Sequence, residues 1–98
     1  MCSSDHEPAQ HALGEMYRDG RGLEQNDAEA VKWFRKAAEK DHEPAQHALG
    51  EMYRDGRGVE QNDVEAVKWF RKAAEKGHAG ARAALARMQE EGRVGAET

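Results

Sequence analysis

A nearly identical internal repeat dominates this sequence of 98 residues. Residues 5–40 return as residues 41–76 with only two changes, Leu23 to Val59 and Ala28 to Val64, and a third copy begins at Gly77 and stops halfway. A unit of this size cannot bury its own apolar face and does so against its neighbours, so this kind of self-similarity is typical of a solenoid. The repeat therefore constrains the architecture more strongly than any short motif does.

The apolar residues of each unit recur at the spacing of two short amphipathic helices. The two stripes of the first unit are Ala9, Leu13, Met16 and Tyr17, then Ala30, Val31, Phe34, Ala37 and Ala38. Between them, the glycines of the segment DGRG end the first helix, and Asn26 or Asp27 caps the second, with Glu29 in capping-box position after Asn26. We expect five helices, near residues 7–19, 27–40, 43–55, 63–76 and 79–91. Leu23 or Val59 should hold the connecting loop of each unit against the core.

Junctions and close contacts give further expectations. Gly77 lies where one helix must reverse into the next, and Asp41 occupies the same register, so we expect Asp41 in the left-handed conformation. Gly14 and Gly50 are predicted to lie where paired helices approach closely. Valine there should be destabilising through overpacking, whereas alanine is expected to be tolerated because Ala86 stands at this register in the third copy.

The pattern A-x-x-x-L-G-x-M-Y-x-x-G-x-G-[LV] from Ala9 to Leu23 is followed by D-x-x-A-V-x-W-F-x-x-A-A from Asp27 to Ala38. Both patterns return in the second unit, and together they resemble the Sel-one-like (Sel1-like) repeat, a relative of the tetratricopeptide repeat. The resemblance implies an all-α fold, a right-handed α-α superhelix of two full helix pairs plus a C-terminal capping helix. It covers residues 5–92 as one domain, with repeat one at 5–40, repeat two at 41–76 and a truncated third repeat at 77–92. A flexible N-terminus, 1–4, and a disordered tail, 93–98, are expected to flank it.

The third unit departs from the family pattern because it lacks a second helix. Ala81, Leu85 and Met88 keep the inner stripe, so this helix should still pack on the preceding pair. Ala86 and Gln89 make its outward face small and polar, as the end of a solenoid must be for solubility.

The resemblance also implies a non-catalytic protein-protein interaction module, an adaptor or scaffold that holds a partner segment in a concave groove lined by the first helices. Carried over residue by residue, the groove positions are His11, Glu15, Arg18, Asp19, His47, Glu51, Arg54, Asp55 and Arg87, followed by Glu90 and Glu91. A solvated surface is the simpler interpretation of the same side chains. An engineered or idealised repeat protein with no dedicated ligand is the alternative function, and the near-identity of the two units suits it.

Charge separates the two halves of each unit, although the net charge is only −4. The first half of the unit is mainly acidic and the second mainly basic, so a partner is expected to be a protein or peptide with exposed Lys or Arg. The rows Lys32, Lys36, Lys40 and Lys68, Lys72, Lys76 are flanked by glutamates, and we interpret them as a solvated outer face rather than as a nucleic-acid or lipid surface.

Few sites of reactive chemistry are indicated. His11 with Glu15, and His47 with Glu51, have the i,i+4 spacing of metal ligands, but two ligands fall short of the usual three or four, and no metal or other cofactor is expected. Motifs for a nucleophile or a phosphate loop are lacking, so we expect no enzyme.

Trp33 and Trp69 are predicted to wedge between neighbouring units. Cys2 cannot form an internal disulfide but could cross-link a dimer, and the oligomeric state stays open. The chain shows neither a secretory signal nor a membrane span, so a soluble protein is expected, with its compartment unknown.

Overall fold

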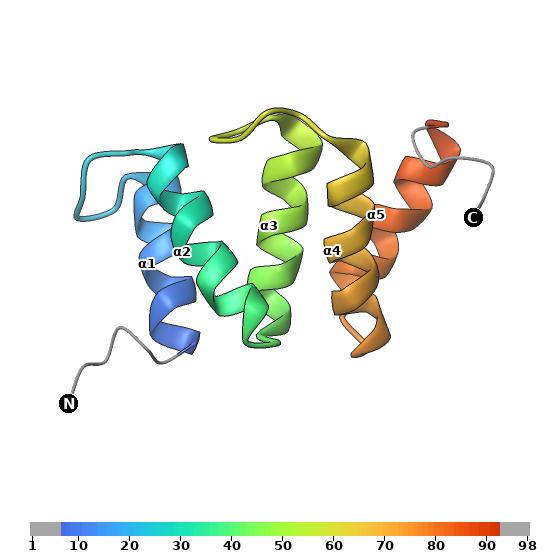
Figure 1. The fold of residues 1–98 in the computed structure, drawn as a ribbon, viewed down its shortest axis with the longest axis horizontal. Helices are drawn as coiled ribbons and strands as arrows, with labels where there is room; N and C mark the ends of the chain where they lie inside the picture. Colours follow the sequence, from blue (N-terminus) through green and yellow to red (C-terminus); the bar gives the residue numbers. More distant parts are fainter. Residues whose placement is uncertain (1–6, 93–98) are drawn as a thin grey trace.

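The computed structural model describes residues 7–92, with side chains from Ala9 onward. Five helices and no strand occur in this part of the chain: α1 (Glu7–Asp19), α2 (Asp27–Glu39), α3 (Glu43–Asp55), α4 (Asp63–Glu75) and α5 (Ala79–Glu90). Successive helices run in opposite directions and stack side by side into an elongated array (Figure 1). The predicted all-α solenoid is confirmed. The expected flexible N-terminus, the Cys2 cross-link and the disordered tail lie outside the described residues.

Side-chain and glycine caps define the helix ends as the sequence predicts. Asn26 is the N-cap of α2, where its Oδ1 accepts a hydrogen bond from the backbone N–H of Glu29 at 3.1 Å. Asn62 does the same for Glu65 at the start of α4. Gly56 ends α3 in the left-handed conformation, with φ of 68°. Because such caps satisfy backbone groups that a helix leaves unpaired, they explain why short helices of 13 residues begin and end where they do.

Asp41 takes the left-handed conformation that its register predicts. Its φ is 68°, and Gly77 at the equivalent junction has a φ of 90°. The ammonium group of Lys76 donates a hydrogen bond to the carbonyl oxygen of Asp41 at 3.0 Å, which links the two junctions. The chain therefore reverses direction in the same way after each helix pair.

The core consists of two clusters that lie one after the other along the solenoid. The first combines residues of α2 and α3 with Trp69 of α4, and the second combines α4 with α5. Trp69 is only 6% exposed and contributes to the core of the preceding pair, which confirms that it wedges between units.

Close packing between paired helices is confirmed at both predicted glycines. A Cβ at Gly50 would lie 2.8 Å from two ring carbons of the buried Phe70, and a Cβ at Gly14 would lie 2.6 Å from the ring of Phe34. The expectation that alanine is tolerated there is therefore wrong. Ala86 has the same register in α5, but it is exposed because, within residues 7–92, no second helix follows α5 to place a phenylalanine against it.

The two connecting loops differ in burial. Val59 packs against the first core cluster as predicted, but its counterpart Leu23 is 36% exposed. The expectation fails for Leu23 because no helix pair precedes α1 within the described chain to receive it.

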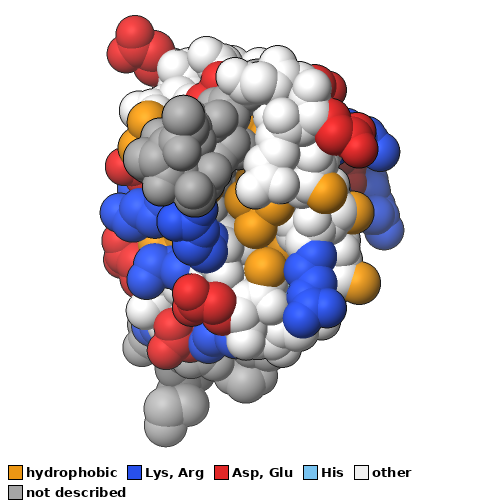
Figure 2. Space-filling model, turned by 90° about the vertical axis from the view of Figure 1, so that its right-hand side faces the viewer, with side chains coloured by type: hydrophobic (Ala, Val, Ile, Leu, Met, Phe, Trp, Pro, Cys, Tyr) orange, Lys and Arg blue, Asp and Glu red, His pale blue; other side chains and the backbone are white. Residues whose placement is uncertain are grey.

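The opposite end of the solenoid is formed by α5. Ala81 and Met88 are fully buried against α4, while Ala86 and Gln89 are exposed, as the cap prediction requires. Figure 2 looks onto this end and shows a narrow strip of hydrophobic side chains between lysine and arginine side chains. The cap thus covers most, but not all, of the apolar surface at this end.

Candidate functional site

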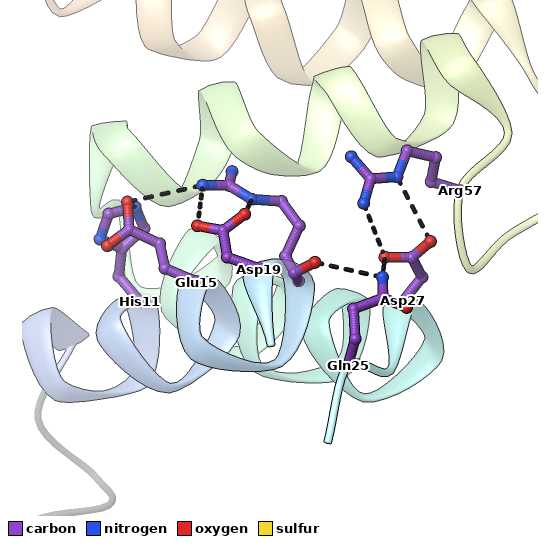
Figure 3. Close-up of polar contacts among 7 residues, drawn as sticks. His11, Glu15, Asp19, Gln25, Asp27 and Arg57 are labelled. Carbon is purple, nitrogen blue, oxygen red and sulfur yellow. Dashed lines mark hydrogen bonds and ion pairs between the residues drawn. The ribbon is translucent and has the colours of Figure 1, made fainter. Parts of the chain in front are cut away.

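Four of the predicted groove residues form a connected polar row on α1. The His11 Nε2 atom lies 3.5 Å from Oε2 of Glu15, and Nε of Arg18 donates to Oδ1 of Asp19 at 3.0 Å. Arg18 also approaches Glu15, with 4.0 Å between Nη2 and Oε2. Figure 3 shows His11, Glu15 and Asp19 along one side of the helix. Spacings of three and four residues bring Glu15 close to Arg18 and His11, whereas Arg18 and Asp19 are adjacent in the sequence.

The same row returns on α3 with nearly the same geometry. His47 Nε2 lies 3.6 Å from Glu51 Oε2, and Arg54 Nε donates to Asp55 Oδ1 at 3.0 Å. The hydrogen bond to Asp19 does most to raise the pKa of Arg18 on α1, and the charge of Glu51 on α3 adds a smaller contribution, so the two rows act on each other electrostatically. The structure therefore brings these predicted residues from two repeats into one surface.

Carboxylates are the most exposed part of each row. The side chains of Glu15 and Asp19 are 41% and 37% exposed, against 23% for Arg18 and 19% for His11. Arg18 is covered because its guanidinium group lies over the ring of Phe34, 5.6 Å from the centroid. The hydrogen bond to Arg18 lowers the pKa of Asp19, so this carboxylate stays ionised well below neutral pH.

The acidity of this layer is smaller than the sequence alone indicates. Asp19 and Asp55 each share their charge with the preceding arginine, and Asp27 pairs with Arg57 of the next repeat at 3.0 Å. The first two pairs join adjacent residues of one helix, whereas Asp27 and Arg57 meet only because the two repeats pack together. The layer is better described as a mixed row with its carboxylates outermost.

Histidines pair across each repeat boundary in this layer. The ring of His11 on α1 lies 5.3 Å from that of His42, the N-cap of α3, and His47 stacks at 4.7 Å on His78, the N-cap of α5. His78 caps α5 directly, because its Nδ1 accepts a hydrogen bond from the backbone N–H of Ala81 at 3.1 Å.

Burial lowers the pKa of both His11 and His47 below 6.5. The carboxylates of Glu15 and Glu51 oppose this effect, while the neighbouring histidines and arginines add to it. Both imidazoles are therefore neutral at pH 7. Within residues 7–92, no three His, Cys, Asp or Glu side chains come together as a group that could hold a metal ion.

A small hollow of about 230 Å³ unites predicted residues of α3 and α5. Arg54, Asp55 and Arg87 line it together with Met88 and Glu91. Met88 is fully buried, so the accessible surface of the hollow is formed by the charged residues around it. Glu90, the remaining predicted position, is exposed and does not line this hollow.

A larger hollow of about 720 Å³, which the sequence did not predict, lies on the second-helix side between α2 and α4. Arg35 donates a hydrogen bond to the hydroxyl group of Tyr53 in its wall. The ammonium groups of Lys68 and Lys72 lie 5.6 Å and 5.8 Å from the ring centroid of Trp69. The lysine face, which we predicted to be solvated, thus borders a concave surface that includes Tyr53 and Trp69. This surface forms only when the helices pack together.

An inter-repeat contact was also missed. Both side-chain oxygens of Asp27, at the start of α2, receive hydrogen bonds from Arg57 at 3.0 Å and 3.3 Å, and Gln25 donates to Asp27 at 2.8 Å (Figure 3). Gly58, with φ of 77°, lies so close to the backbone of Asp27 that a Cβ would overlap it. The segment DGRG therefore serves as more than a helix end. The occurrence of DGRG in both units was the feature of the sequence that could have indicated this second role.

Two segments of the chain, residues 7–42 and 43–78, match the family model of the Sel1 repeat. The chain belongs to the Sel1 repeat family. The architecture agrees, because a Sel1 repeat protein from Oxalobacter formigenes superposes with a TM-score of 0.88 at 42% identity, covering 92% of this chain and 37% of that one. Comparison with curated proteins finds no significant match.

Two further solved structures extend the similarity. The protein c5321, a protective antigen of uropathogenic Escherichia coli strains displaying an SLR fold, has 42% identity and a TM-score of 0.87, with 89% of this chain and 19% of that chain covered. Cysteine rich protein B of Helicobacter pylori has 27% identity and a TM-score of 0.75, with 79% and 58% covered. The chain spans less than two thirds of the length of each of these Sel1 relatives.

Sel1 repeat proteins are in general helical scaffolds for protein interactions and are not catalytic. No helix among residues 7–92 has the length and the apolar character needed to cross a bilayer.

Proposed function

We propose that this Sel1 repeat chain binds an extended segment of a partner protein along the layer formed by α1, α3 and α5, and that the segment carries Lys or Arg side chains. The observation that carries this proposal is the recurrence of one polar row in two neighbouring helices with the same internal distances. A repeated surface offers equivalent subsites to successive residues of an extended segment.

Charge favours a basic segment. The outermost groups of each row are carboxylates, while the arginines lie lower, over the phenylalanine rings. A basic side chain can therefore reach Glu15 or Glu51 before it meets a guanidinium group. Such complementarity acts chiefly on association rate and specificity, and salt screens it over roughly 8–10 Å.

The hollow between α3 and α5 provides an anchor for one such side chain. A Lys or Arg side chain that enters it can bring its charged end to the carboxylate of Asp55 or Glu91 at the wall.

Peptide selection with a matched pair of variants tests the proposal. Displayed random peptides are selected on the wild-type chain and compared on Glu15→Lys combined with Glu51→Lys, and on Lys36→Glu combined with Lys72→Glu as the control. All four residues are on the surface, so circular dichroism should show unchanged helical content. We expect selected peptides to be rich in Lys and Arg, to bind more weakly at high salt and to lose binding only on the first variant.

Retention of binding by the Glu-to-Lys variant, with loss on the control, would instead place the interface at the hollow between α2 and α4. A selection that yields no peptide specific for the folded chain would favour the alternative of a repeat protein without a dedicated ligand.

A further inference from the structure

Each polar row of the first-helix layer holds a histidine beside the glutamate that a basic partner would reach. The Nε2 atom of His11 lies 3.5 Å from Oε2 of Glu15, and Nε2 of His47 lies 3.6 Å from Oε2 of Glu51. The glutamate side chains are 41% and 35% exposed, against 19% and 22% for the histidines. Each carboxylate is therefore open to a partner from outside and has an imidazole ring within ion-pair distance inside its own row.

Aromatic neighbours keep each imidazole in this place. The ring of His47 lies 5.6 Å from that of Phe70, which is fully buried, and 4.7 Å from that of His78 at the start of α5. His11 has equivalent neighbours on α2 and at the start of α3, at 5.6 Å and 5.3 Å. An imidazole that moved away from its glutamate would lose these contacts, so the distance between the two groups is set by the packing of the repeats.

The surroundings of both imidazoles favour the neutral form at pH 7. Burial is the largest effect and lowers the pKa of His11 and His47, against the attraction of Glu15 and Glu51. The elements α2 and α4 contribute phenylalanine rings, which carry no charge. The other charged or titratable groups all oppose protonation: Arg18 acts on both imidazoles, His42 on His11, and Arg54 and His78 on His47.

We propose that His11 and His47 make the binding of a basic partner segment dependent on pH, so that the segment is held at neutral pH and released on mild acidification. The inference rests on the proposed function, because it concerns the same groove. A protonated imidazole lies beside the carboxylate that holds a Lys or Arg side chain and replaces that side chain as its cationic neighbour. Each row thus contains its own competitor for the glutamate, fixed within 3.6 Å of it.

Acidification weakens binding because a bound Lys or Arg opposes protonation of the adjacent imidazole. The complex then binds protons less readily than the free chain, so by linkage the affinity is highest above pH 6.5 and falls as the pH decreases below it. Lys and Arg keep their charge across this range, whereas histidine titrates within it. Helix α5 does not add to the effect, since Ala83 and Arg87 stand at the registers of His47 and Glu51.

Octalysine labelled with rhodamine at its N-terminus is the probe, because its charge stays constant during the titration. Its Kd for the full chain is measured by fluorescence anisotropy between about pH 7.5 and about pH 5.5 at constant ionic strength. We expect the Kd to rise about fivefold towards the acidic end, since two partly exposed charge pairs are affected. Circular dichroism at each pH checks that the helices persist.

His11→Gln combined with His47→Gln removes both titrating groups and keeps polar side chains at their positions. The Kd of this variant should be the same at both ends of the pH range. His42→Asn is the matched control, because asparagine is also a good N-cap for α3. This control should keep the pH dependence, and since His42 opposes protonation of His11, its affinity should begin to fall at a higher pH than that of the wild type.

A Kd that does not change with pH, or that rises as steeply in the variant with both glutamines, would overturn the inference and leave the proposed groove intact. A rise that accompanies loss of the helical signal would also overturn it, since unfolding would then be the cause. If Glu15→Lys combined with Glu51→Lys binds the probe as tightly as the wild type at neutral pH, the proposed function fails and this inference fails with it.

Discussion

Replacing Gly50 with alanine should destabilise the protein, although alanine is the better helix former. The new methyl group would lie 2.8 Å from Cδ1 and Cε1 of Phe70 and 3.1 Å from its Cγ. Phe70 is fully buried, so its ring cannot swing away without disturbing its neighbours. Either α3 and α4 separate slightly or the ring leaves its preferred rotamer.

Two opposing terms determine the size of the effect. Overpacking a buried contact typically costs about 1–3 kcal/mol, and replacing a mid-helix glycine by alanine returns about 1 kcal/mol of helix propensity. Taking the middle of the first range, we expect the free energy of unfolding to fall by about 1 kcal/mol. For a chain of this size that corresponds to a decrease in Tm of roughly 4–8 °C.

Ala86→Gly is the matched control, because Ala86 has the register of Gly50 but is exposed and faces no phenylalanine. There, alanine should be the more stable residue by about 1 kcal/mol. Urea unfolding followed by circular dichroism measures both variants, and Phe70→Leu combined with Gly50→Ala should recover part of the loss. A Gly50→Ala protein more stable than the wild type would refute the close packing of α3 against α4.

Three further outcomes follow from the junctions and loops. Asp41→Gly should be neutral or stabilising by at most about 1 kcal/mol in urea unfolding, because glycine has no steric penalty at φ of 68°, and a clear loss would mean that the carboxylate is needed. Burial lowers the pKa of His47, so the unfolded chain binds a proton at this residue more readily than the folded chain just below pH 6.5. The free energy of unfolding should therefore decrease as the pH falls below 6.5, and the urea midpoint of His47→Gln should depend less on pH. Arg57→Ala should lower the free energy of unfolding by no more than about 1 kcal/mol, because the contact of Arg57 with Asp27 is partly exposed. Gly58→Ala should be clearly more destabilising, because its Cβ would overlap the backbone of Asp27. Equal effects of the two variants in thermal unfolding would contradict this close backbone approach.

The helices, their caps and the junction geometry could be predicted because their causes are local. Asn26 and Gly56 act on backbone groups within a few residues, and the register shared with Gly77 was enough to place Asp41 in the left-handed region. The internal repeat then supplied the long-range order, since each helix pair had to pack on a copy of itself.

Predictions failed where the outcome depended on which neighbour a residue meets. Leu23 and Val59 have the same flanking sequence, but in the part of the chain that the structure describes only Val59 has a preceding repeat to pack against. We expected alanine at position 50 to be tolerated because Ala86 has the same register. The sequence does not show that the ring of Phe70 lies against Gly50. The contact between Arg57 and Asp27 joins positions far apart in the chain. Helical periodicity relates only residues of one helix and could not predict it.

The sequence indicated which residues make up the candidate surface but not how their charges pair. Helical spacing predicted that His11 and Glu15 lie side by side on α1, which their contact confirms, but counting charges along the chain overlooked the pairing of Arg18 with Asp19. The hollow between α2 and α4 exists only through the arrangement of three helices, so no segment of the sequence could indicate it.

The equivalence of α2 and α4 has a consequence for folding. The two helices differ only at Ala28 and Val64, and both of these residues are exposed, so each helix presents the same apolar face to whatever follows it. Helix α5, which packs on α4, can therefore also pack on α2, either of its own chain with the second repeat looped out or of another chain. Exchange of identical elements between protomers is a low-cost route to dimers and a common misassembly of repeat proteins. Refolding at high protein concentration should accordingly produce domain-swapped dimers, which dilution would convert back to monomers only as fast as the helix pairs unfold.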